Sequence, residues 1–224
     1  MKKSLLLLLL ISFILCVNAQ EEKSESKKPP SQEMETVMLA KQLAKYGYQH
    51  FSATALVEAA RILSTVKTQD LKYDSAEKGS VTDDGKEKEN EIQLEISKIL
   101  ETAKTYARND KDLLASIDQI EKSLAQNRGR VGGPGEVYGK VGANVDDRYT
   151  VKFWSDELAE IALVGDGDTD LDLYVYDENG NLIDKDDDYT DDCYVSWVPR
   201  WTGLYIIKIV NRGSVYNRYY LVTN

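Results

Sequence analysis

The sequence predicts an α+β protein of two domains, with N-terminal helical hairpins in a small bundle followed by a C-terminal antiparallel β-sandwich of jelly-roll-like type. Three observations support this. Apolar residues recur every three or four positions over 33–127. Residues 128–135 then hold four Gly and one Pro, which end any helix. From residue 136 the apolar period is two, in about eight short segments separated by turn residues.

The first residues are typical of a secretory signal peptide, which we place at 1–19. Lys2 and Lys3 precede an apolar run over 5–17 that is short for a membrane span, and small residues end at Ala19. We therefore expect cleavage after Ala19, a secreted or periplasmic location and no transmembrane segment in the mature chain.

Composition narrows the range of functions. The net charge of −10 argues against nucleic acid as a partner, because phosphate binding needs clustered Lys and Arg. His50 is the only histidine, which excludes sites built from two imidazoles. Signal cleavage removes Cys16 and leaves Cys193 alone, so we expect a buried thiol and no internal disulfide.

The remaining chain divides into four parts. We predict a disordered tether at 20–32, a helical domain at 33–127, a Gly-rich linker at 128–135 and a β-sandwich at 136–224. Within the helical domain, Ser52 and either Asn109 or Asp110 are candidate N-caps, and the polar stretch 67–89 is predicted to be a long loop. The apolar stripes of the helices either pack on one another or form a docking or oligomerisation surface.

Residues 166–192 are the most distinctive stretch, with twelve carboxylates and one base, Lys185. Leu171, Leu173 and Val175 alternate with polar residues, as in a strand with one buried face. Asn179-Gly180 predicts a two-residue type I′ turn, so the carboxylates would be held by a hairpin.

Such crowded carboxylates repel one another unless a cation lies among them. Ca²⁺ takes six to eight oxygen ligands, and the two sides of the hairpin could supply them. The candidate calcium ligands are Asp168, Asp170, Asp172, Asp186, Asp187, Asp188 and Asp192.

Two other interpretations of these acids remain open. They could form a solvated surface that keeps an exported protein soluble, or two of them could act as a carboxylate-pair hydrolase. An EF-hand is excluded because Leu171 occupies the position that requires Gly.

Aromatic residues near the hairpin suggest a binding surface. Tyr174, Tyr176, Tyr194 and Trp201 are the candidate ligand-binding residues, and an exposed strip of such rings could bind a polypeptide or a glycan. In the alternative interpretation these rings shield strand edges.

Several motifs in order resemble the bacterial pre-peptidase C-terminal (PPC) domain family over about 137–224. They are Gly139-Lys140-Val141, Asp147-Arg148-Tyr149-Thr150-Val151, Asp170-Leu171-Asp172-Leu173-Tyr174-Val175-Tyr176, Asp186-Asp187-Asp188, Trp197-x-Pro199, Gly203-Leu204-Tyr205, Asn211-x-Gly213 and Asn217-x-Tyr219. The resemblance implies a β-sandwich module of exported proteins that often binds calcium.

Together these observations predict an exported, non-catalytic binding or accessory module with a calcium-stabilised sandwich that engages polypeptide or glycan. The alternatives are a carboxylate-pair hydrolase and a structural envelope protein that assembles through its helices.

Overall fold

The computed structural model describes residues 28–81, 91–127 and 133–224. The predicted signal peptide, tether residues 20–27 and linker residues 128–132 lie outside this part of the chain. The described residues form four helices, α1 (Gln32–Gln49), α2 (Ala53–Leu63), α3 (Ile96–Ala107) and α4 (Lys111–Asn127). The same part of the chain forms ten strands, β1 (Gln69–Asp70), β2 (Ser75–Glu77), β3 (Gly135–Val141), β4 (Asp146–Phe153), β5 (Ala159–Gly165), β6 (Leu171–Asp177), β7 (Leu182–Asp186), β8 (Asp192–Trp197), β9 (Gly203–Asn211) and β10 (Asn217–Thr223).

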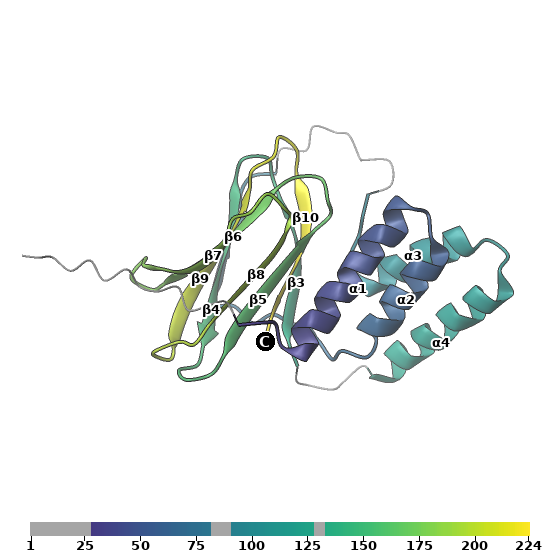
Figure 1. Cartoon of the computed structure of the whole chain (residues 1–224), viewed down its shortest axis with the longest axis horizontal. Helices are drawn as coiled ribbons and strands as arrows, with labels where there is room; N and C mark the ends of the chain where they lie inside the picture. The colour runs from purple at the N-terminus through teal and green to yellow at the C-terminus, as the bar shows by residue number, and fades with distance from the viewer. Residues whose placement is uncertain (1–27, 82–90, 128–132) are drawn as a thin grey trace, which may run out of the picture.

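Two five-stranded sheets form the sandwich (Figure 1). Sheet A has the order β1-β3-β10-β5-β8 and sheet B the order β2-β4-β9-β6-β7. Without the short β1 and β2, the eight remaining strands have the jelly-roll orders β3-β10-β5-β8 and β4-β9-β6-β7, and all their neighbours are antiparallel. The predicted α+β class and the antiparallel sandwich are confirmed.

The sandwich core follows from the period-2 pattern. Alternate residues of each strand point between the sheets, including Val151 of β4, Leu173 of β6 and Ile207 of β9. Cys193 of β8 is also buried there, its thiol lies 3.1 Å from the carbonyl oxygen of Leu171, and burial raises the pKa of that thiol. The predicted buried thiol is confirmed.

Residues 67–80 depart from the predicted long loop. Residues 69–70 pair in parallel with β3, Leu71 packs into the sandwich core, and residues 75–77 pair with β4. The exposed Lys78 then donates hydrogen bonds to the buried Asp147 and Tyr219. This polar stretch has no apolar alternation, so only its tertiary contacts make β1 and β2 strands.

Two of the helices begin at the predicted N-caps. Ser52 caps α2 through its side chain, and the Asp110 carboxylate accepts from two N–H groups at the start of α4. His50 is the C-cap of α1, and its ring packs at a tilt against Tyr46. The predicted tether extends too far, because α1 begins at Gln32 and Ser31 is its N-cap.

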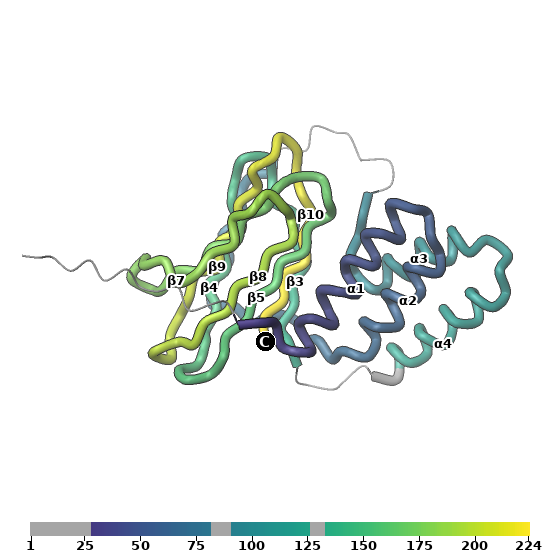
Figure 2. The backbone as a smooth tube through the Cα atoms, in the orientation of Figure 1, coloured from purple at the N-terminus to yellow at the C-terminus, as the bar shows by residue number. Residues whose placement is uncertain are grey.

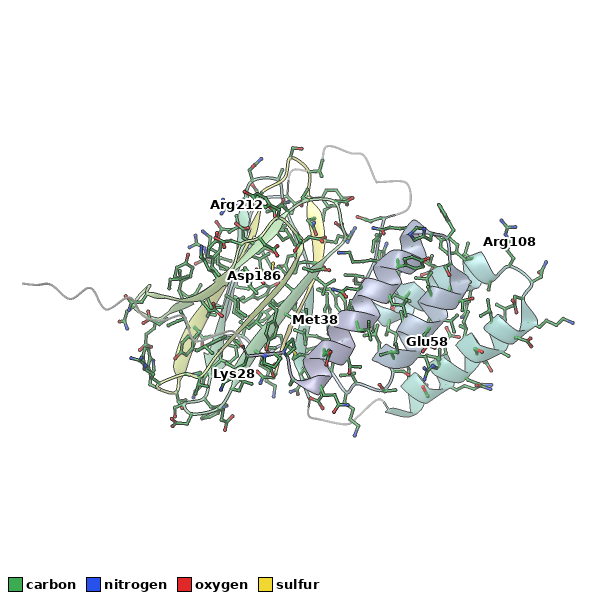
Figure 3. The ribbon with its side chains drawn as sticks, in the orientation of Figure 1. Lys28, Met38, Glu58, Arg108, Asp186 and Arg212 are labelled. Atoms are coloured by element: carbon green, nitrogen blue, oxygen red, sulfur yellow. The ribbon has the colours of Figure 1, made fainter. Side chains whose placement is uncertain are left out.

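The helical bundle covers the outer face of sheet A (Figure 1). Ala162 and Val164 of β5 with Tyr220 and Val222 of β10 share one buried cluster with the helices. Figure 3 shows Met38 of α1 at this boundary. The apolar stripes of the helices therefore pack on one another and on the sheet.

The start of α1 also lies beside the C-terminus (Figure 2). The main-chain N–H of Ser31 donates to the Glu160 carboxylate at 2.6 Å, and that of Asn224 donates to the Glu160 carbonyl at 3.3 Å. Among the described helices none is long and apolar enough to cross a membrane. Helices lie on one side of the sandwich only, so no described helix covers sheet B.

Candidate functional site

The acidic stretch forms the predicted hairpin, β6 paired with β7, but not with the predicted turn. Gly180 has a φ of +82°, whereas Asn179 is not among the residues of positive φ, as a type I′ turn requires. Asp177 instead binds across the turn, because its carboxylate accepts from the N–H groups of Asn179 and Asn181, each at 2.8 Å. The result is a three-residue loop closed by the Asp177 side chain. This loop competes with the two-residue type I′ turn, and the Asn179-Gly180 dipeptide alone does not reveal it.

Helix α1 supplies a cation to the second half of the stretch. Lys45 Nζ lies 2.8 Å from Asp191 Oδ1 and 3.0 Å from Asp192 Oδ1, with these side chains mostly buried. Burial alone would lower the pKa of Lys45, but Asp191 and Asp192 outweigh it and the pKa is raised. Asp192, a predicted calcium ligand, is therefore part of the helix–sandwich contact.

Asp172 has a different partner. Its Oδ2 accepts from Arg212 Nε at 2.5 Å and from the Tyr174 hydroxyl at 3.0 Å, and the Asp172 residue is buried. Arg212 follows β9, and Figure 3 shows it at one end of the sandwich. This ion pair neutralises a second predicted calcium ligand.

Strand β7 uses two carboxylates to cover the edge of sheet A. Asp186 Oδ2 accepts from the main-chain N–H of Tyr194 at 2.9 Å, and Asp184 Oδ2 accepts from that of Ser196 at 3.3 Å. Tyr194 and Ser196 lie on β8, the last strand of sheet A. The carboxylates satisfy N–H groups that an edge strand would leave open to another chain.

The other predicted ligands have local contacts. Asp187 pairs with Lys185 at 2.6 Å, Asp188 accepts from Thr190, and the N–H of Asp168 donates to Asp166. Over 28–81, 91–127 and 133–224, no three Asp, Glu, His or Cys side chains are grouped in a way that could hold a metal ion. Six of the seven predicted calcium ligands are thus divided among several separate contacts.

Asp170 is the predicted ligand that stands apart. Its Oδ1 is buried and has no hydrogen-bond partner among the described residues. Burial raises the pKa of this carboxyl, and the charges of Asp172 and Asp188 raise it further. A cation beside Asp170 would therefore relieve unfavourable charge, which Arg212 already offsets in part.

The four predicted aromatic residues do not form one strip. Tyr174 and Tyr176 stack on the outer face of sheet B, with ring centroids 6.4 Å apart. Tyr194 lies in sheet A, packs against the helices and donates to Glu160 at 2.8 Å. Trp201 stacks on Tyr205 at one end of the sandwich and is 36% exposed. Only the Tyr174–Tyr176 pair lies on an uncovered sheet face.

Strand register reveals neighbours of this pair that sequence reasoning missed. Tyr176 lies between Leu182 of β7 and Ile206 of β9, and Tyr174 lies between Lys185 of β7 and Lys208 of β9. Ile206 was detectable from the sequence as an outward position of β9, but which strands are adjacent is a property of the topology.

Comparison with known proteins assigns no family. No family model and no curated protein matches the sequence. Among solved structures, the pre-peptidase C-terminal domain of a collagenase from Bacillus anthracis is 16% identical, with 42% of this chain and 92% of that chain covered and a TM-score of 0.34.

Two further solved structures show likenesses of the same order. The periplasmic inhibitor of g-type lysozyme, PliG, from Aeromonas hydrophila is 13% identical, with coverages of 41% and 84% and a TM-score of 0.32. The carbohydrate-binding module CBM6cm-2 of Cellvibrio mixtus lichenase 5A, in complex with cellotriose, is 13% identical, with coverages of 45% and 92% and a TM-score of 0.25.

Proposed function

We propose that this protein is an exported, non-catalytic binding or accessory module that engages polypeptide or glycan through the outer face of sheet B. The observation that carries the proposal is the asymmetry of the sandwich. Helices bury the outer face of sheet A, whereas the outer face of sheet B presents the stacked Tyr174 and Tyr176 beside the aliphatic Ile206. Aromatic rings on a rigid, uncovered sheet are well suited to binding because little side-chain entropy is lost.

The engagement of the carboxylates favours binding over hydrolysis. Asp172 is paired with Arg212, Asp186 with a strand edge and Asp192 with Lys45. A carboxylate-pair hydrolase needs two acids aimed at a shared substrate position. These three carboxylates instead hold strands and helices together.

We further propose that calcium stabilises the acidic hairpin, with Asp170 as its central ligand. The support is the buried, unpartnered Oδ1 of Asp170 and the neighbouring charges of Asp172 and Asp188. Carboxylate oxygens are the ligands that Ca²⁺ prefers, and bound calcium would supply charge neutralisation and rigidity. In the described structure Asp172 pairs with Arg212, so this side chain would have to exchange its partner to join such a site.

The test of the function is a binding screen of residues 20–224 on arrays of polysaccharides and of unfolded polypeptides, run beside Tyr174→Ser/Tyr176→Ser. We expect a ligand of one of these classes whose binding the double substitution abolishes. Trp201→Ser is the matched control, because Trp201 lies at the end of the sandwich and not on the tyrosine face. Retained binding by the tyrosine variant would refute the proposed face.

A further inference from the structure

Two complete rows of side chains cross the outer face of sheet B. The first row is Leu182, Tyr176, Ile206, Thr150 and Ser75, and the second is Lys185, Tyr174, Lys208, Arg148 and Glu77. Neighbouring strands are about 4.8 Å apart, so members of a row are in lateral contact range. The first row is mainly apolar and the second holds three cations.

The second row contains a pair that the fold itself disfavours. Arg148 of β4 and Lys208 of β9 are direct cross-strand partners, and like charges in this position destabilise a sheet. Asp146 is shared between them, with Oδ2 2.7 Å from Arg148 Nε and Oδ1 3.7 Å from Lys208 Nζ. Glu77 reaches Arg148 only at 4.0 Å. Local conflicts of this kind are concentrated at functional sites.

We infer that the outer face of sheet B binds an extended polypeptide segment that carries both carboxylates and apolar side chains. The inference rests on the proposed function and names its ligand class. The carboxylates of the segment lie against Lys208, Arg148 and Lys185, and its apolar side chains lie on Tyr176, Ile206 and Leu182.

The composition of the face favours polypeptide over glycan. Besides Ile206 and Lys208, strand β9 directs Leu204 and Val210 outward, and Leu182 is 49% exposed. Aliphatic groups recover free energy by burying apolar side chains, whereas hydroxyl-covered sugars offer little such surface. A centre of aromatic and aliphatic residues with charged neighbours is the usual anatomy of a protein-binding surface.

The expected charge of the ligand follows from where the cations lie on this acidic protein. The chain has a net charge of −10, which on balance repels an acidic segment. The second row places three cations across four adjacent strands on this face, and Lys208 has the longest ion-pair distance, 3.7 Å to Asp146, against 2.6 Å from Lys185 to Asp187 and 2.7 Å from Arg148 to Asp146. A carboxylate-bearing segment is therefore directed to this row, which sets orientation and specificity.

The test is selection from a displayed library of short random peptides on wild type, Lys208→Glu, Tyr174→Ser and Lys122→Glu. Lys122 lies on α4 with its side chain 69% exposed, so Lys122→Glu makes the same charge change away from the sandwich. A thermal melt of each variant serves as the check that it is folded. We expect wild type and Lys122→Glu to enrich peptides with Asp or Glu beside Leu or aromatic residues. A peptide so selected should bind Lys208→Glu about tenfold more weakly, or worse, by titration.

The outcomes separate this inference from the proposed function. Polygalacturonate and a neutral β-glucan are titrated in parallel. Binding of either glycan that depends on Tyr174, without peptide enrichment, would overturn the polypeptide inference and leave the proposed function standing. Enriched peptides that lack carboxylates, or that bind Lys208→Glu unchanged, would also overturn it. If wild type binds neither peptide nor glycan, or if its binding is unchanged in Tyr174→Ser, both the polypeptide inference and the proposed function are rejected.

Discussion

Asp186 Oδ2 accepts a hydrogen bond from the main-chain N–H of Tyr194 at 2.9 Å and so joins the last strand of sheet B to the last strand of sheet A. The sequence suggests a calcium ligand and a ligand-binding ring at these positions. In the structure the carboxylate covers a strand edge, and the ring lies on the side of sheet A that faces the helices. Two residues with separate predicted roles therefore share one structural contact.

Replacing Asp186 tests this contact. We expect Asp186→Ala to lower the free energy of unfolding by about 1 kcal/mol in urea titrations, because a hydrogen bond to a charged acceptor is lost and an edge N–H is opened. Asp186→Asn keeps an acceptor oxygen and should lose less. If the two variants are equally destabilised in chelator, the carboxylate does not act as an acceptor for Tyr194.

Lys45 links helix α1 to the acidic stretch, and we expect it to contribute more to the free energy of unfolding than an exposed cation does. We expect Lys45→Met to cost about 2 kcal/mol, because Asp191 and Asp192 keep their charges in a mostly buried contact. The control is Lys104→Met, whose ion pair with Glu121 is nearly half exposed and should contribute less than about 1 kcal/mol. Equal costs in chemical unfolding would contradict this assignment.

Lys41 makes stability depend on pH. Its ammonium group is buried between α1 and sheet A, where it donates to the Leu94 carbonyl at 2.6 Å and to the Tyr138 hydroxyl at 3.0 Å. Burial lowers the pKa of Lys41 to about 7, although the charges of Glu136 and Glu95 act to raise it.

Between pH 7 and the ordinary lysine value of 10.5, the unfolded chain binds a proton on Lys41 that the folded chain does not. The contribution of Lys41 to the free energy of unfolding should therefore rise with pH across that window, by at most about 1.4 kcal/mol per pH unit. Lys41→Met should remove that component of the slope, as measured by urea unfolding at a series of pH values. An unchanged slope would show that Lys41 is charged in both states.

Replacing Asp170 by Asn should change the stability of the protein in opposite directions with and without calcium. In chelator at neutral pH, Asp170→Asn should be more stable than wild type, because the folded protein raises the pKa of this carboxyl and so disfavours its charge. In millimolar calcium, wild type should gain melting temperature and the variant should not. Absence of any calcium-induced shift in wild type would refute the proposed cation.

Local pattern predicts much of this fold. The two periods locate the helices and the eight strands of the jelly roll, and Ser52 and Asp110 act as caps because capping depends on a residue and its next neighbours. The buried thiol of Cys193 follows from its place in a strand alternation. Such features need only contacts close in sequence.

The site could be predicted only in part, because its contacts join residues far apart in the chain. Sequence alone identifies Tyr174 and Tyr176 as outward neighbours on one strand, but it cannot show that helices cover Tyr194 and leave this pair uncovered. It also cannot show that Lys45 and Arg212 supply the cations expected among the carboxylates.

The sequence by itself determined the classes of element and the face of each strand, since both follow from periodicity. Tertiary structure decided which strands became neighbours, and thereby placed Arg148 opposite Lys208 and drew the polar residues 69–77 into both sheets. The physical reason is that main-chain pairing between strands carries almost no side-chain code, so partners are selected by the packing of the whole sandwich.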